Sequence, residues 1–157
     1  TSKNTSPLFY SQQKNDLSRY LQQGGALLFT GHHLGNALHD SLNGSFDKRY
    51  IRASFVGNQF TRRIEGKFGD EIGNSLSFDL DYGQSDSMKL ETSNNPFFYK
   101  SIVFQTNPSS DFRIVGVKFE SRDYPQYKVA WFGFGLDQVS NKSVGSKILS
   151  STIQWLR

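Results

Sequence analysis

Residues Gly24–Gly35 of the 157-residue chain read GGALLFTGHHLG. This stretch predicts the end of a helix, a short buried strand and a tight turn into a second helix. The strand, Ala26–Thr30, begins with four consecutive apolar residues, which is typical of a central strand covered on both faces. In α/β proteins, ligands and catalytic groups gather at the carboxyl ends of such strands. We therefore take this stretch as the one around which the chain is organised.

Helices are expected on both sides of this strand. An apolar stripe at helical spacing predicts a helix over residues 11–23, which Gly24 and Gly25 end because glycine readily adopts the left-handed conformation of a C-cap. After the strand, leucines at every fourth position predict a helix over residues 33–42. Helix, glycine turn and buried strand together form an αβ unit.

The remaining pattern predicts a single α/β domain over residues 12–157, preceded by a polar lead-in or linker over residues 1–11. Residues 57–100 have the character of a loop-rich β insertion, with short β-like pieces separated by polar turns. The last third is regular again. Its expected strands and final helix are at residues 102–105, 112–120, 127–133 and 143–157.

Composition excludes several chemistries. The chain contains no cysteine, so disulfides, thiolate nucleophiles and cysteine-ligated zinc are ruled out. Its 14 Phe and 7 Tyr indicate an aromatic core. No apolar run approaches the roughly 20 residues of a membrane-spanning helix. The N-terminal residues carry neither a start methionine nor an apolar signal segment, so we expect a mature or excised piece of a longer protein.

Two segments resemble class I glutamine amidotransferase-like domains. Residues 20–31, YLQQGGALLFTG, resemble the family's Y-L-x-x-G-G-x-L-L-x-x-G stretch. Residues 128–135, KVAWFGFG, followed by a helix that ends Gln154-Trp155-Leu156, are similar to its last strand and helix. The resemblance implies a three-layer, flavodoxin-like mixed sheet flanked by helices. The family's first strand has no counterpart in residues 1–11, which implies a sheet that is incomplete at its N-terminus.

The resemblance also bears on function. True amidotransferases carry a nucleophilic cysteine in the turn after the strand, and the absence of cysteine excludes glutaminase chemistry by that mechanism. Related domains occur as non-catalytic modules of larger bacterial proteins, some of them exported peptidases. We therefore expect a binding or assembly module of an exported bacterial protein, secreted, periplasmic or on the cell surface. Its expected partners are other domains of the parent protein or a separate protein, and no cofactor is expected.

The turn after the strand is the main candidate for ligand binding. Its residues are Thr30, Gly31, His32 and His33, and the end of the last strand, Gly133, Phe134 and Gly135, is expected beside it. Backbone N–H groups at such a turn can bind anions, and histidine titrates near neutral pH. The alternative is that the glycines only shape the turn and the histidines cap it.

A hydrolase is the second hypothesis for this turn. Thr30 would act as the nucleophile with His32 or His33 as the base, an arrangement that requires a third, orienting group. Asp40 and Asp137 are the candidates for that group, although nothing in their spacing compels it.

Two further segments suggest ligands. The stretch 79–86, DLDYGQSD, offers Asp79, Asp81 and Asp86 as ligands of an irregular calcium loop, or else is a solvated turn. The basic region Lys48–Lys67 interleaves cations with aromatic residues, as binders of polyanions or carbohydrates do. Its alternative is a set of charges that simply face water.

Overall fold

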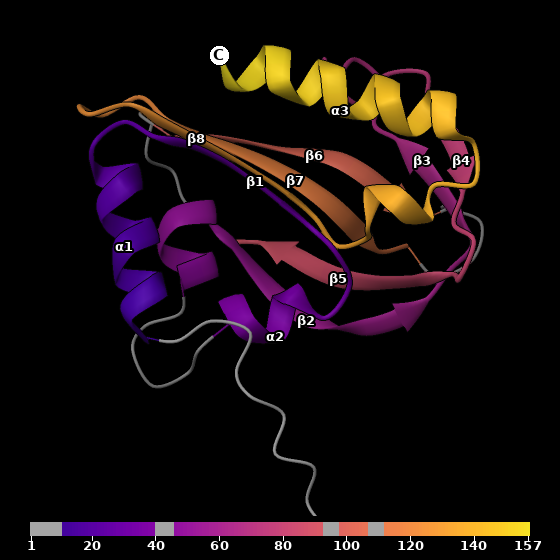
Figure 1. Ribbon diagram of the computed structural model, residues 1–157, viewed down its shortest axis with the longest axis horizontal. Coiled ribbons are helices and arrows are strands. Elements are labelled where there is room, and N and C mark those ends of the chain that lie inside the picture. The colour runs from indigo at the N-terminus through magenta and orange to yellow at the C-terminus, as the bar shows by residue number, and fades with distance from the viewer. Residues whose placement is uncertain (1–10, 40–45, 93–97, 107–111) are drawn as a thin grey trace, which may run out of the picture.

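The computed structural model describes residues 11–39, 46–92, 98–106 and 112–157. Within them, the chain forms an α/β fold in which a mixed, curled sheet is flanked by helices, so the expected class is confirmed (Figure 1). The helical elements are α1 (Ser11–Gln22), α2 (Leu34–Leu38), the π-helical turn η1 (Asp47–Ile51), the 3-10 turn η2 (Leu136–Gln138) and α3 (Lys142–Leu156). The strands are β1 (Ala26–Thr30), β2 (Ala53–Phe60), β3 (Arg63–Gly66), β4 (Ser77–Asp79), β5 (Gln84–Leu90), β6 (Phe98–Thr106), β7 (Ile114–Ser121) and β8 (Tyr127–Phe132).

The sheet combines one parallel pair with several antiparallel pairs. Its main path is β1-β8-β7-β6-β3-β4, and β5 branches from β7 to pair with β2. Strands β1 and β8 are parallel, with Leu28 opposite Ala130, whereas the other described pairs are antiparallel. Among the described residues, β5 is paired with β7 at Met88 and Ile114, and the β2–β5 pair branches from the main path there.

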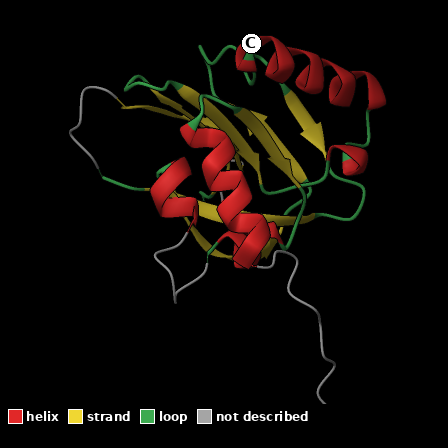
Figure 2. Cartoon of the chain, turned by 60° about the vertical axis from the view of Figure 1, so that its left-hand side comes forward, coloured by secondary structure: helices red, strands yellow, loops and turns green. Residues whose placement is uncertain are grey.

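Each face of the sheet packs against helices. Along β8, Val129 and Trp131 point into one core while Ala130 and Phe132 point into the other, as the period of two in a strand requires. Helix α3 covers one face, and α1, η1 and α2 cover the other (Figure 2). The expectation that β1 is covered on both sides is therefore confirmed.

The position of β1 in the sheet differs from the expectation of a central strand. Among the described residues β1 pairs with β8 alone, so it ends the main path. The Gly25 carbonyl accepts a hydrogen bond from the Lys128 N–H, and the Gly31 N–H donates to the Phe132 carbonyl. Because bonding alternates along a parallel strand, the backbone N–H and C=O of Leu28 point away from β8. Burial on both faces marks helices above and below a strand, but it does not require a second neighbouring strand.

The segment 57–100 contributes to the sheet. The expected β-like pieces correspond to β3 and β4, which extend the sheet beyond β6. Strand β5 arises where the sequence predicted polar turns. The helix expected over residues 33–42 is α2, which ends at Leu38. Asp40 and residues 1–10 of the lead-in expected over residues 1–11 lie outside the described residues, whereas Ser11 begins α1. In the part of the chain that the structure describes, no helix is long and apolar enough to cross a membrane.

Candidate functional site

The turn after β1 lies beside the end of β8, as their parallel pairing requires. The Thr30 hydroxyl donates to the carbonyl oxygen of Phe134 at 2.7 Å, and the Gly31 N–H donates to that of Phe132 at 3.2 Å. A groove of about 430 Å³ opens here, which we call the strand-end groove. Its lining residues are Thr30, Gly31, His32, Leu34, Gly135, Leu136, Asp137 and Gln138.

A buried carboxylate occupies the backbone donors of this turn. Asp86, on β5, is fully buried, and its Oδ1 and Oδ2 accept hydrogen bonds from the N–H groups of His33 and Gly35, both at 2.7 Å. The Asn58 amide adds a third bond to Oδ1 at 2.6 Å. The expected anion-binding donors are therefore satisfied by the chain itself, 51 residues further along from Gly35.

The turn holds His33 in an unusual backbone conformation. Its φ of 65° and ψ of 2° place it in the left-handed region, where a residue other than glycine is uncommon. The Asp86 carboxylate holds the His33 N–H in this position. The bond therefore stabilises a backbone geometry that costs free energy by itself.

A smaller hollow of about 250 Å³, the β2–β5 hollow, lies next to the turn and is lined in part by His32 and His33. Besides the two histidines, this hollow is lined by Asn58, Gln59, Phe60, Gln84 and Ser85. On the groove side, the Gln138 amide nitrogen lies 2.8 Å from His32 Nδ1. His32 lines both depressions.

The glycine-rich end of β8 divides into buried and groove-lining residues. Phe134 is fully buried and packs against Phe78, Phe104 and Phe132. Gly133 lies against the backbone of Asp86, where an added Cβ would overlap a carbonyl oxygen. Of the three predicted ligand contacts in this segment, the structure therefore places Gly135 at the groove, while Gly133 and Phe134 are buried and do not line it.

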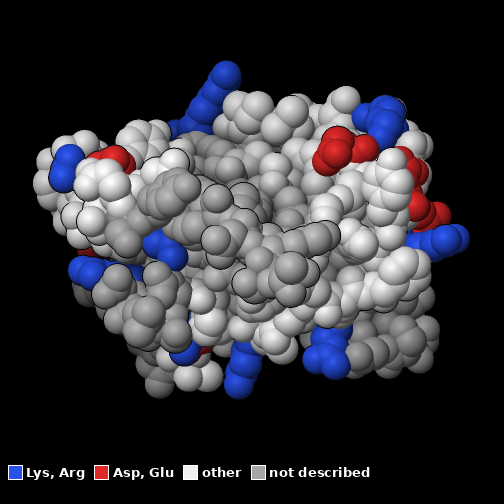
Figure 3. All heavy atoms as spheres, turned by 60° about the horizontal axis from the view of Figure 1, so that its bottom comes forward, with Lys and Arg blue, Asp and Glu red and all other residues white. Residues whose placement is uncertain are grey.

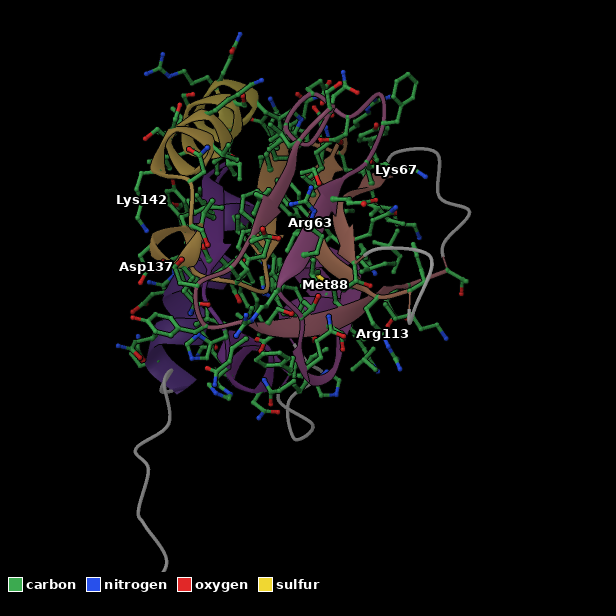
Figure 4. All side chains as sticks on the ribbon, turned by 90° about the vertical axis from the view of Figure 1, so that its right-hand side faces the viewer. Arg63, Lys67, Met88, Arg113, Asp137 and Lys142 are labelled. Carbon is green, nitrogen blue, oxygen red and sulfur yellow. The ribbon has the colours of Figure 1, made fainter. Side chains whose placement is uncertain are left out.

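The hydrolase candidates are close in space without forming a catalytic chain of hydrogen bonds. The Thr30 hydroxyl donates to a carbonyl, and His32 Nδ1 contacts Gln138. Asp137 lies at the rim of the groove, near the beginning of α3, where its carbonyl accepts from the Lys142 ammonium at 2.6 Å (Figure 4). Among the described residues, no chain of hydrogen bonds leads from the Thr30 hydroxyl through a histidine ring to a carboxylate.

The three carboxylates of the expected calcium loop have separate partners. Asp79 pairs with Arg63 at 3.3 Å, and Asp81 lies 3.7 Å from Lys142. Asp86 is buried in β5 and accepts from backbone N–H groups. Within the described ranges, no group of three or more His, Asp or Glu side chains is arranged to hold a metal ion.

The basic region Lys48–Lys67 is divided by β2. Lys48 and Arg49 precede this eight-residue strand and Arg62 and Arg63 follow it, so about 26 Å of extended chain separates the two groups. Figure 3 shows one face of the molecule, on which Lys and Arg side chains lie apart from one another. The basic residues of this region therefore form two groups along the chain, one on each side of β2.

Sequence reasoning missed Asp86 as the anchor of the turn and Gln138 as the partner of His32. Both contacts join residues far apart in the chain, separated by 53 and 106 positions. Local patterns contain no signal for such pairs.

Comparisons with known proteins define the fold. No protein-family model and no curated protein matches the chain. The solved structures similar to it include the mmIFT52 N-terminal domain, with a TM-score of 0.61 and 19% identity over 94% of this chain and 72% of that one. They also include a putative ThuA-like protein from Bacteroides uniformis ATCC 8492, with a TM-score of 0.60 and 12% identity over 94% of this chain and 64% of that one. Likeness at these identities shows a shared fold.

Proposed function

We propose that this chain is a non-catalytic α/β module that serves binding or assembly within a larger, exported bacterial protein. We also propose that its fold is a flavodoxin-like, degenerate form of the class I glutamine amidotransferase-like domain. The resemblance of residues 20–31 and 128–135 supports the family assignment and the exported setting. The observation that carries the functional proposal is the bonding of the buried Asp86 carboxylate to the turn after β1.

Acyl transfer requires hydrogen-bond donors aimed at the oxyanion that develops in the transition state. The N–H groups of His33 and Gly35 lie where the fold would offer such donors, and both already donate to Asp86. A substrate oxygen would have to displace a fully buried carboxylate that accepts three hydrogen bonds. The N–H groups of this turn therefore have a structural role, because they hold the turn against β5.

The candidate nucleophile, the Thr30 hydroxyl, supports the same non-catalytic proposal. The chain has no cysteine, and the hydroxyl proton of Thr30 is directed to the Phe134 carbonyl rather than to a base. A nucleophilic hydroxyl needs a base within hydrogen-bond reach that can take this proton. The hydrolase alternative would require the Thr30 side chain to leave its present bond.

Hydrolysis assays test the proposal. The wild-type chain, Thr30→Val and the double variant His32→Ala/His33→Ala are incubated with a chromogenic ester, an anilide and glutamine, with Thr61→Val as a matched control. We expect all four proteins to give the rate of buffer alone. Turnover that Thr30→Val abolishes and Thr61→Val retains would overturn the proposal in favour of the hydrolase. In the full parent protein, the double histidine variant is expected to keep the biological phenotype.

A further inference from the structure

The outer edge of β1 presents backbone groups that no described strand uses. Gly25 and Gly31 bond to β8, so in the alternation of a parallel strand the N–H and C=O groups of Leu28 and Thr30 point the other way. Across the described ranges, β1 is paired with β8 alone, and no backbone hydrogen bond reaches these groups from another segment. Leu28 and Thr30 are half-buried, whereas their partners in β8 are fully buried. The edge of β1 is therefore open at these two residues.

At the first residue of β1, a side chain occupies this edge. The Ala26 N–H donates to the phenol oxygen of Tyr20 at 3.4 Å, and the phenol hydroxyl donates to the Ala26 carbonyl at 3.5 Å. These are the two bonds that the backbone of a neighbouring strand would make at Ala26. The Tyr20 side chain is 47% exposed, so it lies at the surface. Tyr20 therefore closes the edge at Ala26 and leaves it open at Leu28 and Thr30.

The sheet has two other edges in the part of the chain that the structure describes, and both have features that hinder strand addition. Strand β4 contains three residues, and its Asp79 pairs with Arg63 at the surface. Strand β2 is interrupted by a bulge between Phe55 and Gly57. Short edges, charges and bulges are the usual means of preventing edge-to-edge pairing. Strand β1, with the sequence ALLFT and an unbroken register, has none of them.

Helix α3 extends the apolar surface beside this edge. The ring of Trp155 lies 5.3 Å from the Lys118 ammonium, which places its side of α3 over β7. At 3.6 residues per turn, Leu149 and Ile153 lie about 120° or more around the helix from Trp155. Since the strand order is β1-β8-β7, this side of α3 faces β1, which α3 also contacts (Figure 1). Leu149 is 41% and Ile153 is 42% exposed, so the apolar side chains of an added strand would meet them there.

Charge and area indicate what fits this edge. Helix α3 carries Lys142 and Lys147 and no acidic residue, and Arg157 follows it. A second copy of the chain would bring the same cationic helix against this one, whereas acidic side chains would complement it. A stable dimer also buries about 800 Å² on each partner, while the five residues of β1 span only about 17 Å. A short extended peptide needs less area, because main-chain hydrogen bonds supply much of its affinity.

We propose that the edge of β1 binds an extended segment of a partner polypeptide as an added strand, apolar at its centre and acidic at its ends. Its backbone bonds to Leu28 and Thr30, and its apolar side chains pack on Leu149 and Ile153. The inference rests on the proposed function of the chain as a binding or assembly module and names the kind of partner. With this strand in place, β1 has a neighbour on each side, as a strand covered on both faces usually has.

Amide hydrogen exchange of the chain measures strand addition residue by residue, with the peptide acetyl-EDVTVIVDE-amide as the probe. The N–H groups of Leu28 and Thr30 are expected to exchange at least about tenfold more slowly with saturating peptide than without it, because they gain hydrogen bonds. Those of Leu27 and Phe29, which bond to β8, should exchange slowly in both states. The peptide acetyl-EDVPPIVDE-amide should give no protection, since its two adjacent prolines remove N–H groups from both edges.

Two variants test the contacts of the added strand. Tyr20→Phe removes the phenol from Ala26, so the peptide gains two further hydrogen bonds and is expected to bind about three times more tightly or better. Leu149→Glu/Ile153→Glu is expected to bind at least about tenfold more weakly, because an apolar surface is lost and the acidic ends are repelled. Val56→Glu, a change of the same kind at an exposed position of β2, should bind as the wild type does.

Equal protection by the double-proline peptide, or no protection by any peptide, would overturn the edge site and leave the binding function to another surface. Protection of Leu28 that rises with protein concentration without peptide, together with a dimer in sedimentation, would identify a second copy as the occupant and overturn the proposed partner. Tighter binding of acetyl-KKVTVIVKK-amide would overturn its acidic character. Peptide cleavage that depends on Thr30 would instead overturn the non-catalytic function while leaving the edge site in place.

Discussion

The N–H of Asp86 donates to the carbonyl oxygen of Gly133 at 2.6 Å, and a Cβ on Gly133 would overlap the carbonyl oxygen of Asp86. Glycine is therefore required at the end of β8 for steric reasons, so that β5 can approach. This contact places Asp86 where its side chain can reach the turn after β1. The backbone contact between Gly133 and Asp86 thus fixes the position of the carboxylate that binds the turn after β1.

Gly133→Ala is expected to lower the free energy of unfolding by at least about 2 kcal/mol, because the obstructing atom is backbone and cannot rotate away. Urea denaturation measures the change. Gly57→Ala is the control, since a Cβ there meets nothing within 4 Å. Equal stability of the two variants would contradict the close approach.

Asp86→Ala is expected to destabilise the fold by at least about 2 kcal/mol, because it leaves the N–H groups of His33 and Gly35 without their acceptor. Thermal and urea unfolding measure the loss. Asp81→Ala, in the same acidic stretch, removes a side chain 3.7 Å from Lys142 at the surface and should change stability by well under 1 kcal/mol. Comparable losses in both variants would show that the burial of Asp86 does not explain its effect on stability.

A third prediction concerns the contribution of a buried ion pair to stability. The Lys118 ammonium lies 2.8 Å from Asp70 Oδ2, with both side chains nearly inaccessible, and it also contacts Glu71. Desolvation of the buried ammonium opposes its charge, but hydrogen bonds to Asp70 and Glu71 outweigh this and raise the pKa of Lys118. Lys118→Met is expected to cost about 3–5 kcal/mol, because it leaves a buried carboxylate uncompensated.

The double variant Lys118→Met/Asp70→Asn should recover part of this loss, because no buried charge then remains at that position. Lys128→Met provides the comparison. Its ammonium lies 5.4 Å from the ring centroid of Trp155, close to the 5.3 Å of Lys118, but it donates a hydrogen bond to a backbone carbonyl, that of Trp155. If the two single variants lose the same stability, the aromatic contact and not the ion pair explains the effect.

Tyr127 makes stability depend on alkaline pH. Burial raises the pKa of its phenol from 10.0 to about 12. Between these values the unfolded chain has released the proton and the folded chain retains it, so the unfolded state binds fewer protons and the free energy of unfolding falls as pH rises. The contribution is fully present below about pH 10.

Ultraviolet titration of tyrosinate measures this directly. Tyr127→Phe is expected to remove a late transition and to flatten the loss of stability above pH 10. Tyr124→Phe is the control, because that side chain is 98% exposed. Loss of the late transition in Tyr124→Phe would show that the assignment to Tyr127 is wrong.

Local sequence patterns were sufficient for the elements whose burial is one-sided or complete. The glycine pair that ends α1 works as expected, since Gly24 has a φ of 86° and its N–H bonds the carbonyl of Leu21. The apolar run of β1 and the helical stripe of α3 were equally informative. In these segments the residues that decide the structure are neighbours in the chain.

Strand β5 shows where local patterns fail. Its sequence QSDSMKL reads as a polar turn, yet Ser85, Asp86 and Ser87 are buried. Their polar groups are satisfied by partners on other segments, such as the Gly57 carbonyl that accepts from the Ser87 hydroxyl at 2.9 Å. Hydropathy could not predict this burial, because it depends on long-range hydrogen bonds. The anchor of the candidate site was missed for the same reason.

The two tryptophans report on opposite sides of the sheet. Trp131 is fully buried in the core beneath α1, whereas Trp155 packs against the core beneath α3, with the ammonium groups of Lys118 and Lys128 at 5.3 and 5.4 Å from its ring centroid. A nearby positive charge and a change in solvation both alter indole emission. In variants that retain one tryptophan each, the emission would therefore report on one core at a time. Such variants would reveal whether the cores on the two faces of the sheet unfold together or one after the other.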